Sequence, residues 1–258
     1  MTFYKYHGTG NDFILFDNRE NNISLSKEQI ANLCHRRLGI GADGLMLLEN
    51  AAGYDFRMVY YNSDGGESTM CGNGGRCITA FAKSLGIIAS IADFVAIDGP
   101  HTAKIGDDGL ISLHMKNVQE MKIYDGYTLL NTGSPHFVQW VKDVKAIDVF
   151  TEGKKIRNQP WFQPDGINVN FVQIPDKGKL SVRTYERGVE DETLSCGTGV
   201  TAAAIAASGI ETGTFKTCIE TPGGHLEVSF IKNTPTTATD VILTGPAVFV
   251  FKGEIGMR

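Results

Sequence analysis

A short motif, Cys-Gly-polar-Gly, occurs twice in this chain, and each copy leads directly into an apolar run. The two copies and the runs that follow them are 71–74 with 78–85, and 196–199 with 200–207. Each run has the length of a short helix and stops at a glycine, Gly86 or Gly209, as helices often do. We therefore expect each cysteine at or just before a helix N-terminus, where backbone N–H groups and the helix dipole favour a thiolate.

The spacing around the two motifs indicates a duplicated unit. Gly10 lies 61 residues before Cys71, and Gly133 lies 63 residues before Cys196. A glutamate also stands four residues before each of these cysteines. Similar sequence features that recur in the same order are typical of a repeated structural unit. Two such cysteines in matched settings suggest a pair of thiols that work on one substrate.

Both apolar runs lack a polar face, and a helix of this kind is normally buried on all sides. The surrounding chain reads as short strands, for example at 3–6, 13–16 and 54–61. The prediction is an α+β fold of two pseudo-symmetric halves. Each half is a curled, barrel-like mixed β-sheet wrapped around a central apolar helix.

The division between the halves is expected near residue 116. The N-terminal half would comprise 1–116 together with a returning C-terminal strand, 248–258, and the C-terminal half would comprise 117–247. An additional helix is predicted from a capping box at Ser26 and Gln29, running to about Leu38 with Gly39 as its stop.

Composition restricts the partners. A chain of 258 residues with net charge −5 and pI near 5.7 is not expected to bind nucleic acid or an anionic membrane surface. No apolar run approaches the roughly 20 residues that a membrane span needs, and the N-terminus shows no signal-peptide pattern. Five cysteines form no disulfide framework, so we expect reduced thiols and a cytoplasmic location.

Two facing thiols suit one demanding reaction, the inversion of an amino-acid α-carbon. That reaction needs a base on one face of the carbon and an acid on the other. The helix N-termini would bind the α-carboxylate and stabilise the charge that develops beside it. The alternative for a single cysteine is a small buried apolar residue, and this remains our interpretation of Cys34, Cys77 and Cys218.

Other signals exclude resident cofactors. The cysteine spacing fits no zinc motif, and no paired histidine motif accompanies it, so no metal is expected. No lysine has the context of a Schiff-base site, so no pyridoxal phosphate is expected. Arg76 opposes the helix dipole near a helix start, and we expect it to have a carboxylate partner, with Glu67 as the candidate, or to be solvated.

These motifs together resemble the diaminopimelate epimerase family over essentially the whole chain. The segments that carry the resemblance are His7-Gly-Thr-Gly-Asn11-Asp-Phe, Gly39-Ile-Gly-Ala-Asp-Gly44, Cys71-Gly-Asn-Gly-Gly-Arg-Cys77, Asn168-Val-Asn-Phe, Glu186-Arg-Gly-Val-Glu-Asp-Glu-Thr and Cys196-Gly-Thr-Gly. The resemblance implies cofactor-independent, two-base epimerisation of LL-2,6-diaminopimelate to the meso form, in lysine and peptidoglycan precursor biosynthesis. It also implies a small diacid diamine substrate and a homodimer.

The resemblance further implies roles for individual residues. Cys71 and Cys196 match the acid and base, usually labelled donor and acceptor in that order, and His136 and Glu186 match residues that poise the thiols. Substrate-contacting positions match Asn11, Asn62, Gly72, Asn73, Ser134, Asn168, Glu186, Arg187, Gly197 and Thr198. Ser134 departs from the family, which usually has asparagine there, and Gly44 stands where some members have glutamine.

Two alternative functions remain open at this stage. The first is a proline or hydroxyproline racemase of similar architecture, which the Glu186-Arg187 turn argues against. The second is a thiol redox sensor in which Cys71 and Cys196 form a reversible disulfide. Turnover of an amino-acid substrate would distinguish either enzyme from the sensor.

Overall fold

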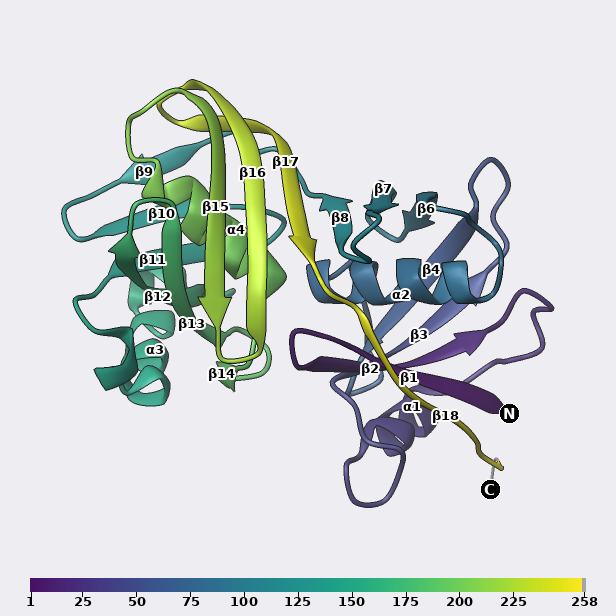
Figure 1. Cartoon of the computed structure of the whole chain (residues 1–258). Helices are drawn as coiled ribbons and strands as arrows, with labels where there is room; N and C mark the ends of the chain where they lie inside the picture. Colours follow the sequence, from purple (N-terminus) through teal and green to yellow (C-terminus); the bar gives the residue numbers. More distant parts are fainter. Residues whose placement is uncertain (257–258) are drawn as a thin grey trace. The chain divides into compact units, whose positions relative to one another are not determined.

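The computed structural model describes residues 1–256, which form two compact units. The first unit consists of Met1–Leu113 and the C-terminal segment from Gly245, and the second consists of His114–Thr244. The first and last described strands therefore belong to the first unit, where they pair with each other (Figure 1).

The first unit contains one mixed sheet. Its strands are β1 (Thr2–Gly8), β2 (Asn11–Asp17), β3 (Gly44–Glu49), β4 (Phe56–Asn62), β5 (Glu67–Ser68), β6 (Ile91–Ala96), β7 (Gly99–Ile105), β8 (Ile111–His114) and β18 (Val248–Glu254). They pair in the order β18-β1-β2-β3-β4-β6-β7-β8, with the short β5 also against β4. The β2–β3 and β4–β6 pairs are parallel, and the other pairs are antiparallel.

The second unit repeats this pattern. Its strands are β9 (Met121–Ile123), β10 (Tyr127–Asn131), β11 (Pro135–Trp140), β12 (Asn168–Asp176), β13 (Lys179–Glu186), β14 (Asp191–Thr193), β15 (Gly213–Thr221), β16 (Gly224–Thr234) and β17 (Thr237–Gly245). They pair in the order β9-β10-β11-β12-β13-β15-β16-β17, with β14 against β13. The β11–β12 and β13–β15 pairs are the parallel ones.

The two sheets correspond strand for strand, including the positions of their parallel pairs. A helix also occurs at the equivalent place along the sequence of each unit. It is α1 (Lys27–Cys34) before β3 in the first unit and α3 (Val149–Arg157) before β12 in the second. The short 3-10 helices η1 (Val144–Ala146) and η2 (Pro160–Phe162) have no counterpart in the first unit. The predicted duplication of a mixed α+β unit is confirmed.

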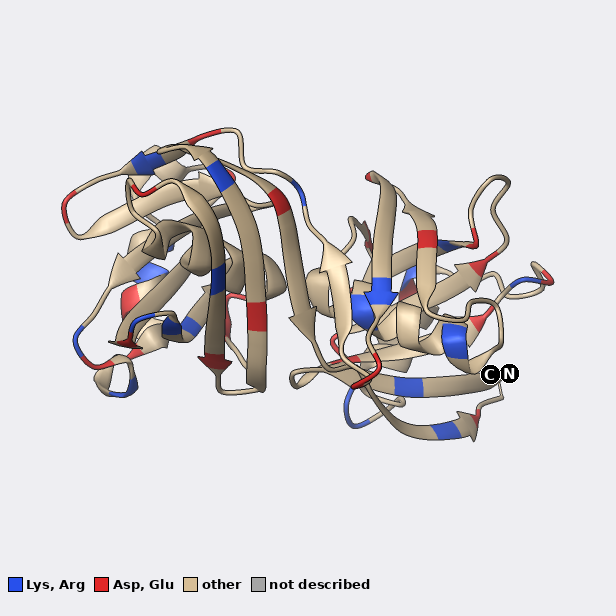
Figure 2. Cartoon of the chain, turned by 45° about the horizontal axis from the view of Figure 1, so that its top comes forward, with Lys and Arg blue, Asp and Glu red and all other residues tan. Residues whose placement is uncertain are grey.

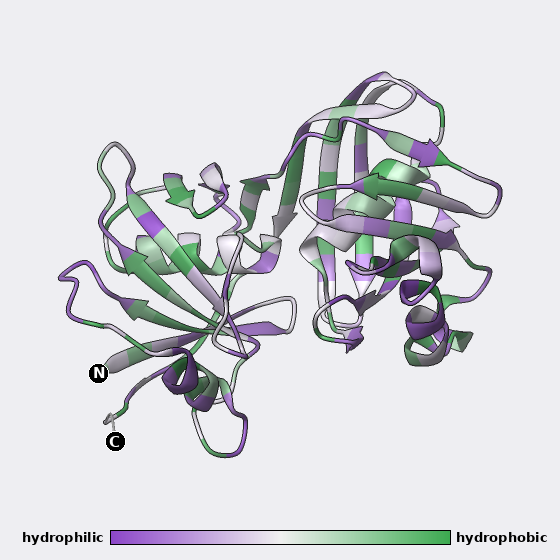
Figure 3. Cartoon of the chain, turned by 180° about the vertical axis from the view of Figure 1, so that it is seen from behind, coloured by the Kyte–Doolittle hydropathy of each residue, from purple (hydrophilic) through white to green (hydrophobic). Residues whose placement is uncertain are grey.

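One helix lies at the centre of each unit. In the first unit, α2 (Gly72–Ser84) packs against β1, β2, β3 and β7, so the sheet curves around it. In the second unit, α4 (Gly197–Ala207) packs against β10 to β13, β15 and β16. Positions 199–206 of α4 are all buried, as expected for a helix without a polar face. The apolar colouring in Figure 3 accordingly lies on the central helices and on the strands around them.

The structure corrects the predicted extent of the first helix. Ser26 and Gln29 form the capping box, but α1 ends at Cys34 rather than near residue 38. His35 adopts an extended conformation, and its Nδ1 accepts hydrogen bonds from the backbone N–H groups of Arg37 and Leu38. This side-chain turn replaces the next helical turn. The helix α3 was not predicted from the sequence, although Asp148 caps it by accepting a hydrogen bond from Thr151 N–H.

Charged residues of both signs are distributed over both units (Figure 2). The helix α4 carries none, in agreement with its burial. Among residues 1–256, no helix combines the length and the apolar character required to cross a membrane.

The enclosure of α4 leads to a test of packing. Ala203 is fully buried on this helix, so Ala203→Leu should overpack the core and lower the free energy of unfolding by about 1–3 kcal/mol. Ala207→Leu, at the half-buried last residue of α4, is the matched control and should change it by less than about 0.5 kcal/mol. Urea unfolding measures both variants, and equal losses would contradict the enclosed packing.

Candidate active site

Each cysteine of the repeated motif is the N-cap residue of its central helix. Cys71 precedes α2 and is half-buried, whereas Cys196 precedes α4 and is buried. Both have extended backbone conformations, and neither caps its helix with a side-chain hydrogen bond. The sulfurs therefore lie where the helix dipole stabilises negative charge.

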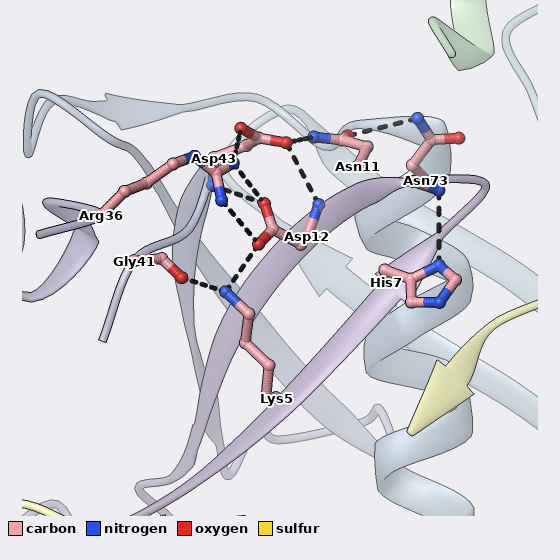
Figure 4. A network of polar contacts seen from close by, with 9 residues as sticks. Lys5, His7, Asn11, Asp12, Arg36, Gly41, Asp43 and Asn73 are labelled. Atoms are coloured by element: carbon pink, nitrogen blue, oxygen red, sulfur yellow. Dashed lines mark hydrogen bonds and ion pairs between the residues drawn. The ribbon is translucent and has the colours of Figure 1, made fainter. Parts of the chain in front are cut away.

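Beside Cys71, two carboxamides form a hydrogen-bonded chain. The Nδ2 group of Asn73, in the first turn of α2, donates to Asn11 Oδ1 at 3.2 Å. Asn11 opens β2, and its own Nδ2 donates to Asp43 Oδ2 at 2.8 Å. The sulfur of Cys71 lies 3.8 Å from the same Asn11 oxygen. Figure 4 shows the two amides aligned in sequence toward Asp43.

Asp43 belongs to a cluster of charged groups behind Asn11 (Figure 4). Arg36 donates to Asp43 at 2.6 Å and to both oxygens of Asp12, and Lys5 pairs with Asp12 at 2.8 Å and also donates to the Gly41 carbonyl. Burial alone would raise the pKa of Asp12, but the hydrogen bonds from Arg36 and Lys5 outweigh it and lower the pKa to about 2. The Asp12 carboxylate therefore stays ionised at neutral pH and holds the loop that carries Asp43.

Arg76, in the second turn of α2, differs from both expectations. It is fully buried, and among the described residues its guanidinium donates to neutral oxygens rather than to Glu67. Its acceptors are Gly72 O, Asn73 Oδ1, Thr9 Oγ1 and Pro246 O, at 3.0–3.4 Å. A charge-assisted hydrogen bond to each of several segments offsets part of the cost of burying the cation.

Beside Cys196, the chain of hydrogen bonds is built from hydroxyls and an imidazole. The sulfur lies 3.5 Å from Thr198 Oγ1, in the first turn of α4. Ser134 Oγ lies 3.1 Å from Thr198 Oγ1 and 3.0 Å from Nε2 of His136 in β11. Asn168 Nδ2, at the start of β12, also donates to Ser134 Oγ at 3.1 Å.

The hydrogen bonds beside Cys196 have one consistent direction of donation. Asn170 has its Nδ2 directed at His136 Nδ1, 3.1 Å away, so the imidazole proton belongs on Nε2 and is donated to Ser134. The Ser134 hydroxyl then accepts two hydrogen bonds and donates its only proton to Thr198. The Thr198 proton is left to point toward the sulfur of Cys196.

His136 is a neutral member of this chain. It is fully buried, and burial together with the nearby Arg187 guanidinium lowers its pKa to about 3. It therefore acts at neutral pH as a hydrogen-bond donor of fixed tautomer and not as a cation.

The remaining predicted polar residues of the second unit lie together where β12 begins and β13 ends. The Oδ1 atom of Asn168 accepts from the backbone N–H of Arg187 at 2.8 Å. Glu186, the last residue of β13, accepts from the Thr193 hydroxyl at 2.9 Å. The Arg187 guanidinium donates to the carbonyl of Asp165 at 3.2 Å. Glu186 and Arg187 thus lie at the end of β13, and the Arg187 backbone there also orients the side chain of Asn168.

The other predicted residues follow from these elements. Gly72 and Gly197 are the first residues of α2 and α4. Asn62 is the last residue of β4 and is exposed, and its backbone closes the turn 62–66 through hydrogen bonds with Gly65 and Gly66. The structure thus groups Asn11, Asn73 and Cys71 in one unit, but it does not connect Asn62 to them.

Asp43 and Asn170 were not recognised from the sequence, although both hold site residues in place. Asn170 stands two residues after Asn168 on the same strand, so the two share one face of the sheet. The side chain of Asn170 also explains why position 199 is a glycine, because a Cβ there would collide with Asn170 Oδ1. No group of three or more His, Cys, Asp or Glu side chains in residues 1–256 is arranged to hold a metal ion.

The fold is shared with solved structures of distant sequence. A phenazine biosynthesis protein of the PhzF family from Bacillus anthracis superposes with a TM-score of 0.78 at 14% identity, covering 100% of this chain and 99% of that one. A probable proline racemase from Agrobacterium radiobacter superposes with a TM-score of 0.69 at 16% identity, covering 100% and 93%. The duplicated mixed sheet around a central helix is thus a fold that this chain shares with both proteins.

Sequence comparison defines the family. The sequence model of the diaminopimelate epimerase family matches residues 3–120 and 128–250. Proteins with that name from Flavobacterium psychrophilum and Chlorobaculum tepidum are 54% and 42% identical, covering 99% and 96% of this chain and 100% and 98% of theirs. The chain belongs to the diaminopimelate epimerase family. It is an amino-acid epimerase, and the resemblance seen in its motifs is confirmed.

The neutral state of His136 makes stability depend on pH. Its pKa in the folded protein, about 3, lies below the ordinary value of 6.5, so the unfolded chain takes up a proton first as pH falls. Stability should therefore decrease from about pH 6.5 downward, with a slope that approaches about 1.4 kcal/mol per pH unit. Urea unfolding of wild type and His136→Gln at pH 7, 6 and 5 measures this slope. Parallel pH profiles would show that His136 is not the responsible group.

Proposed function

We propose that this enzyme epimerises LL-2,6-diaminopimelate to the meso form by a two-base mechanism with Cys71 and Cys196. The observation that carries the proposal is the repeated placement of a cysteine at the N-cap of a buried helix, in a chain of this family. The substrate would be a small diacid diamine, and the reaction would serve lysine and peptidoglycan precursor biosynthesis in the cytoplasm.

The chemistry requires one thiolate and one thiol. The thiolate removes the α-proton from one face, and the opposite thiol delivers a proton to the other face. Backbone N–H groups at the helix starts bind the α-carboxylate and stabilise the negative charge that develops next to it. The proposal requires both sulfurs to flank one α-carbon. It needs no cofactor, because stabilisation and proton transfer are both supplied by the chain.

The hydrogen bonds beside each sulfur support a division of roles at rest. The Thr198 hydroxyl is oriented to donate toward Cys196, which favours the thiolate there. Asn11 presents an oxygen to Cys71, which favours the protonated thiol. Cys196 would therefore be the base for the LL substrate and Cys71 the acid. In the reverse direction the roles exchange.

The substrate's polar groups would meet the amides and charges around the two cysteines. Proposed contacts are Asn11, Asn62, Gly72, Asn73, Asn168, Glu186, Arg187, Gly197 and Thr198. Arg187 suits a carboxylate because a guanidinium can bind it through two parallel hydrogen bonds. Ser134 was predicted as a further contact, but its hydroxyl already has His136, Asn168 and Thr198 as partners. We assign it to the support of Thr198 together with His136.

The test is isotope exchange at the α-carbon. Incubation of the protein with LL-diaminopimelate in deuterated water should give the meso product with one deuterium at the inverted centre, without added cofactor. Cys71→Ala and Cys196→Ala should each lower the rate of inversion by at least about 10³-fold, since each removes one of two obligatory proton carriers. Cys218→Ala, at an exposed cysteine outside both helix starts, is the matched control and should retain activity.

The same assay separates the alternatives. Inversion of proline in preference to diaminopimelate would assign the chain to the proline racemase type. Oxidation that changes association state, in a protein that turns over neither substrate, would assign it to thiol redox sensing. Exchange that survives the loss of both cysteines would end the two-base proposal.

We further propose that the enzyme is a homodimer in which β18 forms the interface. This strand pairs with β1 on one side only, among the pairings of the described residues, and is therefore an edge strand. Its residues Val248, Phe249, Val250 and Phe251 are each 41–50% exposed. An exposed, apolar edge strand is suited to being covered by another chain, and a second copy would make the contact self-complementary.

Charge introduced on this edge should separate the two copies. Val250→Asp is expected to convert the dimer to monomer in sedimentation analysis, because burying a carboxylate in an apolar contact is unfavourable. Ile210→Asp, at a residue 74% exposed in the second unit, is the control and should leave the association state unchanged. A monomeric wild type would refute the proposed dimer.

A further inference from the structure

The carboxamide chain beside Cys71 has two ends of fixed polarity. At one end, Arg76 donates to Asn73 Oδ1 at 3.0 Å, and a guanidinium can only donate hydrogen bonds. At the other end, Asp43 accepts from Asn11 Nδ2 at 2.8 Å, and an ionised carboxylate can only accept. Arg36 holds the second oxygen of Asp43 at 2.6 Å.

The fixed ends determine how the two amides are oriented. Because Arg76 takes the oxygen of Asn73, the nitrogen of Asn73 must face Asn11. Because Asp43 takes the nitrogen of Asn11, the oxygen of Asn11 must face Asn73. Each requirement agrees with the other, so rotating either amide by 180° would place like groups together at both of its contacts.

The orientation decides which atom Cys71 meets. The sulfur lies 3.8 Å from the oxygen of Asn11. If Asn11 were rotated, its NH₂ group would occupy that place. An amide oxygen accepts a hydrogen bond from a thiol, whereas an amide N–H stabilises a thiolate. The polarity of the chain is thus transmitted to the protonation of the sulfur.

We propose that Asp43 is a positioning residue for Cys71. With Arg76 fixing the opposite end, Asp43 holds the amide of Asn11 in the orientation that keeps an acceptor oxygen toward the sulfur. Cys71 is thereby kept as a protonated thiol before substrate arrives. The role in catalysis rests on the function proposed above, but the effect on the thiol does not.

Burial makes the orientation depend on these contacts. Asn73 is 1% exposed and Arg76 is fully buried, so water does not provide Asn73 with alternative partners for its oxygen. The side chain of Asp43 is 42% exposed, so an isosteric change there should be accommodated without loss of the fold. Asp43 is therefore the end of the chain that is best suited to mutation.

The experiment measures the reactivity of Cys71 directly. In Asp43→Asn, Arg36 still takes the remaining oxygen, so the new NH₂ group faces Asn11 Nδ2. Two facing NH₂ groups favour rotation of the Asn11 amide, which then presents its own NH₂ group to the sulfur. The thiolate fraction of Cys71 at pH 7 should then rise about three- to tenfold, since one pKa unit is a tenfold change in that fraction. The rate of iodoacetamide alkylation from pH 6 to 10, with the Cys71 peptide quantified by mass spectrometry, reports this change.

Two matched variants separate orientation from charge. Asp43→Glu keeps an accept-only group and should remain within about twofold of wild type. Glu67→Gln removes one negative charge at an exposed residue four positions before Cys71 and leaves Asp43 and its partners intact, so its alkylation rate should rise by less than about twofold. Equal rates in Asp43→Asn and wild type, or an equal rise in Glu67→Gln and Asp43→Asn, would overturn the proposal.

The two proposals can fail separately. If wild type exchanges the α-proton of diaminopimelate while Asp43→Asn leaves the alkylation profile unchanged, the positioning role is wrong and the function stands. If alkylation shifts as expected but no exchange occurs, the function is wrong and the positioning of Cys71 stands. Where both hold, Asp43→Asn should lower kcat for inversion about tenfold with less effect on KM, and Asp43→Glu should restore it.

Discussion

The burial of a central helix is the constraint on which each unit depends. The sheet covers most of the sides of this helix, so further polar groups meet it mainly at its ends. The N-terminal end carries unpaired backbone N–H groups and the positive end of the dipole. A cysteine at that position in both units, Cys71 and Cys196, is thus placed by packing where an anion is favoured. The location of the chemistry follows from the way the core is covered.

The duplicated scaffold supports two different polar environments. The strand order and the parallel pairs are the same in both units, but the groups beside the sulfurs differ. In the first unit, amides stand between Arg76 and Asp43, and an acceptor faces the sulfur. In the second, a neutral imidazole, His136, leads through hydroxyls to a donor that faces the sulfur. Two equivalent scaffolds can thus give two thiols opposite preferences for the proton.

The sequence predicted what depends on local pattern, and it missed what depends on contacts between distant segments. The apolar runs, the capping box at Ser26 and the repeat of Cys-Gly-polar-Gly are local, and they led to the correct fold class and family. The early end of α1 depends on the side chain of His35 folding back onto the next two residues, which no helical periodicity records. Asp43 and Asn170 lie inside two of the motif segments, but the local pattern assigns neither of them a role. Their roles appear only when the sheet brings them to Asn11 and His136.

Arg76 shows how such contacts override a local rule. A cation near a helix N-terminus is disfavoured by about 0.3–1 kcal/mol. In this fold, its guanidinium instead joins the turn at Thr9, the start of α2 and the returning segment at Pro246. Hydrogen bonds from a charged donor contribute about 1.5–3 kcal/mol each, so a few of them outweigh the dipole. The same residue that connects the C-terminal segment to the central helix also fixes the amide of Asn73, which in turn donates to Asn11 beside the cysteine, so the closure of the fold and the order of the site depend on one side chain.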